Sequence, residues 1–129
     1  MSGDTKKSCP ALNSEDAIAW ASANNLKVVL PTEFQLLIDI DSQNDRETFD
    51  QNFDLVDSIY GVVDSVETRS RSGDSAKSHI VLTLKTPLKS TTERVALQAV
   101  LGSDRRREAH SLQRIFLGEK NPTLFFEKP

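Results

Sequence analysis

Residues 34–41, Phe-Gln-Leu-Leu-Ile-Asp-Ile-Asp (FQLLIDID), carry the pattern that decides the fold. Side chains on a strand alternate between its two faces, so Asp39 and Asp41 project to one side, about 7 Å apart along the chain. The other side is apolar and consists of Phe34, Leu36, Ile38 and Ile40. We therefore predict a strand with one buried face and one charged face. Two carboxylates at this spacing suit a divalent cation, which prefers oxygen ligands, and the alternative is a strand that simply ends in solvent.

The segment after this strand has the clearest helical pattern in the chain, and Gly61 is suited to end it. Its apolar residues recur at steps of four, three and four: Phe49, Phe53, Val56 and Tyr60. Strand-like alternation follows at residues 62–71 and 77–85. The other predicted elements are helices at residues 14–24, 93–101 and 105–117 and a short strand at residues 123–127.

The predicted order after the first helix is strand, helix, strand, strand, helix, helix, strand. This order is typical of an α+β fold of the ferredoxin-like or RRM-like split βαβ type, with an antiparallel sheet and helices on one face. In that fold the first and third strands are neighbours in the middle of the sheet, and an extra N-terminal helix is expected here. Residues 1–13 are predicted to be a flexible tail. Residues 14–129 are predicted to form a single domain, large enough to bury a core without disulfides.

The face opposite the helices is expected to collect ionisable side chains from three strands. The strand at residues 34–41 contributes Asp39 and Asp41, and the strand at residues 77–85 contributes His79. The flanking strand at residues 62–71 contributes Glu67, Arg69 and Arg71. Their convergence predicts a site for a metal ion or a phosphate group. The alternative is a solvated face with cross-strand ion pairs, because a half-exposed antiparallel sheet carries polar residues there.

Two groups of basic residues are candidates for binding phosphate. The first group would bracket His79 on neighbouring strands: Arg69, Arg71 and Lys77. The second group lies in the first turn of a predicted helix, whose free N–H groups attract phosphate: Arg105, Arg106 and Arg107. Cations in this turn oppose the helix dipole, so their position indicates a functional role in binding phosphate. The alternative is that they form ion pairs with nearby acidic residues.

The composition excludes several classes of protein. With 16 basic and 19 acidic residues the net charge is −3, so the chain as a whole is not a nucleic-acid-binding polycation. One cysteine, Cys9, leaves no basis for a disulfide framework or a cysteine zinc cluster. The aromatic residues fit core positions rather than a base-stacking surface, which disfavours ordinary RNA recognition. Those assigned to the core are Phe49, Phe53, Phe116, Phe125 and Phe126.

The chain also lacks the patterns of membrane and secreted proteins. No run of about 18 apolar residues occurs, and the N-terminus has no apolar segment typical of a signal peptide. We expect no membrane association and a cytoplasmic location, which would be the host cytoplasm for a phage-encoded protein.

Residues 34–84 resemble the catalytic core of the archaeo-eukaryotic primase and primase-polymerase superfamily. Its hydrophobic-Asp-x-Asp motif is matched by residues 38–41, and its Ser-x-His motif loosely by Ser78-His79, where the serine directly precedes the histidine unless Lys77 takes its place. The resemblance implies template-directed nucleotidyl transfer, with Asp39 and Asp41 holding Mg²⁺ or Mn²⁺ and His79 contacting nucleotide phosphates. The family's further carboxylate would be Glu67 or Glu127.

A second resemblance is to small phage- or plasmid-encoded proteins, over residues 93–112 and 121–127. Two hypotheses follow. The first is a primase-like protein that processes nucleotides or nucleic acid, with Asp39, Asp41 and His79 as catalytic residues and Asp39, Asp41 and Glu67 as metal ligands. The second is a non-catalytic module, encoded by a mobile element, that binds a host protein or nucleic acid. Both leave a homodimer open.

Overall fold

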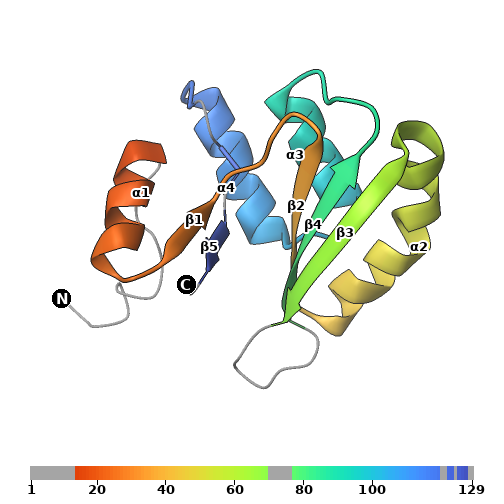
Figure 1. The fold of residues 1–129 in the computed structure, drawn as a ribbon, viewed down its shortest axis with the longest axis horizontal. Helices are drawn as coiled ribbons and strands as arrows, with labels where there is room; N and C mark the ends of the chain where they lie inside the picture. The colour runs from red at the N-terminus through yellow and green to blue at the C-terminus, as the bar shows by residue number, and fades with distance from the viewer. Residues whose placement is uncertain (1–13, 70–76, 120–121, 124, 128–129) are drawn as a thin grey trace.

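The computed structural model describes residues 14–69, 77–119, 122–123 and 125–127, and these ranges form an α+β fold (Figure 1). The elements in chain order are α1 (Ser14–Ala23), β1 (Lys27–Val29), β2 (Gln35–Ile40), α2 (Gln43–Tyr60), β3 (Val62–Arg69), β4 (Ser78–Leu84), α3 (Thr91–Val100), α4 (Arg105–Phe116) and β5 (Phe125–Glu127). The predicted flexible tail, residues 1–13, lies outside the described ranges. Among the helices described, none combines the length and the apolar character that a membrane span requires.

The main sheet is antiparallel and has the strand order β2-β4-β3. The first and third strands of the split βαβ pattern, β2 and β4, are neighbours as predicted, but β2 lies at an edge and not in the middle of the sheet. In the register of β2 and β4, Leu37 lies opposite Val81 and Asp39 lies opposite His79. Directly opposite residues share a face of the sheet, so Asp39 and His79 lie on the same face.

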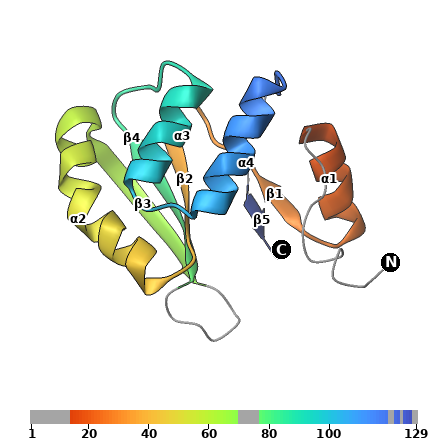
Figure 2. The same cartoon turned by 180° about the vertical axis from the view of Figure 1, so that it is seen from behind.

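The core lies between this sheet and its helices. Helices α2 and α3 cover one face of the sheet, and α4 lies beyond β2 (Figure 2). The buried core cluster takes alternate residues of β2 and β4 together with side chains from the helices and loops. It consists of Leu36, Ile38, Ile40, Phe49, Val56, Ile80, Leu82, Leu84, Leu88 and Leu101. The predicted apolar side of residues 34–41 and of α2 therefore faces the core.

Local signals mark both ends of α2, and Gly61 ends the helix as predicted. The Ser42 side chain accepts a hydrogen bond from the Asp45 N–H at 3.1 Å and caps the helix. Gly61, with φ of 72°, follows its last residue, and its N–H donates to the Asp57 carbonyl. This left-handed turn leads directly into β3.

Strand β3 contains a bulge, and the side chains after it lie on the face opposite to the predicted one. Val62 lies opposite Leu84 and packs against the core, but Asp64, not Val63, lies opposite Thr83. One extra residue in a strand turns every later side chain to the other face. Beyond the bulge, Glu67 therefore lies opposite Ile80, on the face toward the helices.

The last strand does not join the main sheet. β5 pairs with β1 in a separate two-stranded antiparallel sheet, in which Val28 lies opposite Phe126. In the split βαβ pattern the last strand would lie beside β2. Here side chains of α3, α4 and their connection take that place, as the hydrogen bonds below show.

Candidate functional site

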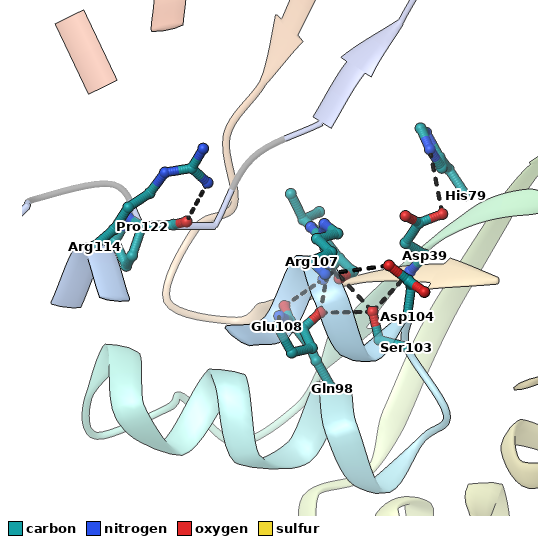
Figure 3. Close-up of polar contacts among 10 residues, drawn as sticks. Asp39, His79, Gln98, Ser103, Asp104, Arg107, Glu108, Arg114 and Pro122 are labelled. Atoms are coloured by element: carbon teal, nitrogen blue, oxygen red, sulfur yellow. Dashed lines mark hydrogen bonds and ion pairs between the residues drawn. The ribbon is translucent and has the colours of Figure 1, made fainter. Parts of the chain in front are cut away.

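Asp39 and His79 form the centre of the candidate site (Figure 3). The Asp39 Oδ1 lies 3.7 Å from the His79 Nε2, and both side chains are partly buried. The face they share is not open as expected, because the ring of Phe125 from β5 stacks on the His79 ring with centroids 4.0 Å apart and an interplanar angle of 6°. The β1-β5 sheet thus supplies an aromatic cover for this end of the face.

Burial has the largest effect on the Asp39 carboxyl. Burial raises the pKa of this carboxyl above its ordinary value, and the charges of Arg107 and His79 offset only part of that rise. Arg107 supplies the larger of the two offsetting charges.

The free edge of β2 is closed by polar groups of α3, α4 and their connection. On this edge the backbone N–H and C=O groups of alternate residues find partners outside the sheet, as buried backbone polar groups require. The bonds are from Leu37 N–H to Gln98 Oε1 (2.9 Å), from Asp39 N–H to Ser103 Oγ (3.0 Å), from Asp104 N–H to Asp39 O (2.7 Å), from Arg107 Nη1 to Leu37 O (2.6 Å) and from Arg94 Nε to Gln35 O (3.0 Å).

Glu108 holds this closing group together. Its carboxylate accepts hydrogen bonds from Gln98 Nε2 at 2.8 Å, Ser103 Oγ at 2.6 Å and Arg107 Nη1 at 2.7 Å. The guanidinium of Arg107 also lies over the Phe125 ring, 4.5 Å from its centroid. Burial lowers the pKa of Arg107, and the neighbouring Glu108 and Asp39 charges oppose that shift. The network joins α4, β2 and β5 through one buried ion pair.

Sequence reasoning missed most of this network, but an ion pair with a nearby acid was one of the two roles that it left open for Arg107. Its guanidinium, predicted to bind phosphate, instead bonds to Glu108 and to the Leu37 carbonyl. Asp104 supplies a carboxylate at the N-cap of α4 and accepts from the Arg107 N–H at 3.2 Å, so the chain itself occupies that helix start. The signal that could have indicated this arrangement is Gln98, Ser103, Arg107 and Glu108 lying within one helix-turn-helix segment.

Asp41 lies just past the end of β2, about half exposed. Its carboxylate is 3.9 Å from the Nζ of Lys77, and its N–H donates to Asp45 at 2.9 Å. Asp41 lies two residues after Asp39, and Lys77 lies two residues before His79. All four side chains therefore lie at one end of the same face of the sheet. Within that group each carboxylate lies beside a basic side chain.

Glu67 and Arg69 do not join that group as predicted. Because of the bulge, Glu67 and Arg69 lie on the opposite face, and Arg71 lies outside the described residues. Glu67 accepts two hydrogen bonds from Arg46 of α2, at 3.0 and 2.9 Å. Burial acts to raise the pKa of Glu67, but the hydrogen bonds from Arg46 and Ser78 and the charges of Arg46 and Arg69 together lower it. The prediction of one shared ionisable face is therefore wrong for Glu67 and Arg69.

The predicted metal ligands do not fit a shared Mg²⁺ or Mn²⁺ ion. Asp39 is paired with His79, Asp41 with Lys77, and Glu67 with Arg46 on the far side of the sheet. Within the part of the chain that the structure describes, no group of three or more histidine, cysteine, aspartate or glutamate residues is placed to hold a metal ion. The side chain of Glu127, the other candidate, lies outside the described residues.

The outward face of α4 carries the remaining predicted phosphate ligands, Arg105 and Arg106, both exposed. Beside them lie exposed apolar side chains: Leu112 is 49% exposed, Phe116 90% and Leu117 56%. The inward face is polar, since Glu108, Ser111 and Arg114 are buried. The assignment of Phe116 to the core is therefore wrong. Apolar residues at 112 and 116 ordinarily mark the inward side of a helix, and here they mark the outward side.

Comparisons with known proteins were made against family models, curated proteins and solved structures. None of the three finds a match to this chain. The function therefore has to be argued from the surfaces and contacts described above.

Proposed function

We propose that this chain is a binding module that engages an acidic segment of a partner protein through the outward face of α4. The observation that carries the proposal is the reversed polarity of this helix, which buries Glu108 and Arg114 but exposes Phe116. A buried polar face and an exposed large apolar group are both informative, because each is unfavourable unless something satisfies it. Gln98, Ser103 and Arg107 donate to the buried Glu108, and Arg114 donates to the Pro122 carbonyl. A partner would cover the exposed apolar side chains.

Charge on the same face indicates the chemistry of the partner. Arg105, Leu112 and Phe116 are separated by seven and four residues and lie on one stripe of the helix. Arg106 and His110 are exposed beside it. Exposed guanidinium groups around an apolar centre suit carboxylates around an apolar anchor, the usual arrangement of a polar rim and a hydrophobic core.

A protein partner fits this surface better than nucleic acid does. The exposed outer side of α2 carries Glu47, Asp50 and Asp54, on the same helical layer as α4. These carboxylates would repel a phosphate backbone that extended beyond α4. Phe116 and the leucines also offer apolar area that phosphate contacts do not use.

The support for nucleotidyl transfer is weaker. It rests on the direct cross-strand pairing of Asp39 with His79, which agrees with the motif order of the primase resemblance. Against it stand the pairing of each predicted metal ligand with a basic residue and the cover of Phe125 over His79. We therefore assign these residues to the stability of the fold.

The test uses a fluorescent amphipathic helical peptide of leucine and glutamate, with a leucine and lysine peptide as its counterpart. The acidic peptide should bind the wild type in a salt-sensitive manner and the lysine peptide should not. Phe116→Ser and Arg105→Glu/Arg106→Glu should each weaken binding by about tenfold or more, as loss of a central contact does. Ile59→Ser is the matched control, because Ile59 is 64% exposed on α2.

Three results would overturn the proposal. One is equal binding by the wild type and both α4 variants. Another is preferential binding of single-stranded DNA or of anionic vesicles, which would assign the face to nucleic acid or lipid. The third is Mn²⁺-dependent binding of ATP that is lost in Asp39→Ala/Asp41→Ala, which would restore the nucleotide hypothesis.

A further inference from the structure

The two outer edges of the main sheet differ in whether other parts of the chain bond to their backbone groups. The edge of β2 is closed by Gln98, Ser103, Asp104 and Arg107. On the outer edge of β3, by contrast, no described strand pairs, and six of its eight residues are exposed. An edge of this kind presents unpaired N–H and C=O groups that can accept a further strand.

An apolar row crosses the sheet and ends at this edge. Leu37, Val81 and Val66 lie directly opposite one another on β2, β4 and β3. Leu37 is fully buried, Val81 is partly buried and Val66 is 53% exposed. The row is covered at the β2 side and uncovered at the β3 side, so its open end lies where a further strand would add.

We propose that a second copy of this chain adds its β3 antiparallel to this edge, which makes a six-stranded sheet across a two-fold axis. The axis stands perpendicular to the sheet, so the outer faces of the two copies are continuous. Val66 of one copy then lies opposite Val66 of the other, and the two apolar rows join into one. This surface is separate from the α4 face, and the inference does not depend on the proposed function.

The residues of β3 select the register centred on Val66. In it, Asp64 lies opposite Thr68 and Ser65 opposite Glu67, so no like charges meet. An axis at Glu67 would place two carboxylates opposite each other, and an axis at Ser65 would place Val66 opposite Asp64. The bulge at Val63 lies outside the five residues that pair, 64–68.

The closed β2 edge explains why association would stop at two copies. Once the two β3 edges are paired, the outer strands of the joined sheet are the two β2 strands. Their edges already carry the side-chain hydrogen bonds of α3 and α4. The dimer thus has no open strand edge in the joined sheet to which a third copy could add. Closed two-fold dimers are the commonest assemblies of soluble proteins.

The register gives a sharp cross-linking test. In a Cys9→Ser background, which removes the chain's single cysteine, Val66→Cys should form a disulfide-linked dimer under mild oxidation because the two thiols face each other across the axis. Asp64→Cys is the matched control and should cross-link poorly, since its partner is residue 68. Equal cross-linking at both positions, or none at position 66, would overturn the register.

Sedimentation of the intact chain tests the dimer itself. Val66→Lys should raise the dimer dissociation constant about a hundredfold, because two ammonium groups would meet at the centre. Leu55→Lys, at a residue 56% exposed on α2, should leave it unchanged. Circular dichroism checks that both variants fold, and Val66→Thr offers a milder second variant. A wild type that stays monomeric up to about 1 mM would refute the proposal.

Discussion

Replacing Arg107 with methionine should strongly destabilise the fold. The change removes the cation that Glu108 pairs with at 2.7 Å and the donor that the Leu37 carbonyl accepts from at 2.6 Å. The Glu108 side chain is only 5% exposed, so its carboxylate would stay buried with two neutral donors. Breaking one partner out of a buried pair costs roughly 3–5 kcal/mol. Domains of this size are stable by about 5–15 kcal/mol, so the loss is a large part of the total.

Urea unfolding followed by circular dichroism measures this loss. With a denaturant slope of about 2 kcal/mol/M, the midpoint should fall by roughly 1.5–2.5 M. Arg105→Met and Arg106→Met are matched controls in the same helical turn, and both should remain within about 0.5 kcal/mol of the wild type because these side chains are exposed. The double variant Arg107→Met/Glu108→Gln should cost less than the sum of its single changes. If Arg107→Met unfolds like Arg105→Met, the buried network does not form in solution and the closure of the β2 edge is refuted.

Two further predictions concern other contacts between the helices and their connections. The Tyr60 hydroxyl donates to Glu93 at 2.9 Å, and this hydrogen bond raises the pKa of Tyr60 above its ordinary value of 10.0. The stabilisation from the bond is thus complete below pH 10 and is lost as the pH rises through the pKa of the folded state. Absorbance titration of the chain's one tyrosine should show that its pKa falls toward 10 in Glu93→Gln. An equal pKa in the wild type and the variant would contradict the contact. Gly102→Ala should destabilise by more than about 3 kcal/mol, because φ is +79° and the new Cβ would clash with the Asp45 carbonyl oxygen. Gly118→Ala, with φ of +82° but no atom within 4 Å, should cost only about 1 kcal/mol, and equal thermal melts for the two variants would contradict the packing at Gly102.

Much of the fold could be predicted from local patterns. The alternation in residues 34–41 and the helical spacing of Phe49, Phe53 and Val56 report which side of each element is apolar, and burial then decides which side faces in. Ser42 and Gly61 mark the ends of α2 through their own backbone chemistry. These signals are contained within a few residues, and the order of the elements that they define then indicated the pairing of β2 with β4.

The site was predicted less well because its geometry depends on distant residues. The bulge at Val63 adds one residue to β3 and has no sequence signal, since it contains neither glycine nor proline. That single residue moved Glu67 to the helix side, where Arg46 pairs with it. The inward turn of Arg107 likewise depends on an unpaired strand edge that no local pattern reveals.

The closure of β2 and the exposure of Phe116 have one physical origin. A strand edge needs donors and acceptors, and α4 supplies them by turning Arg107 and Glu108 inward. The inward positions of α4 are taken by Glu108, Ser111 and Arg114, which lie three residues apart on one face of the helix. Leu112 and Phe116 therefore remain outside. The sheet thus gains a closed edge at the cost of an apolar helix surface, and a partner on α4 would be expected to recover that burial. Loss of the partner's contact should leave the fold intact, whereas loss of Arg107 should weaken both the fold and the surface that α4 presents.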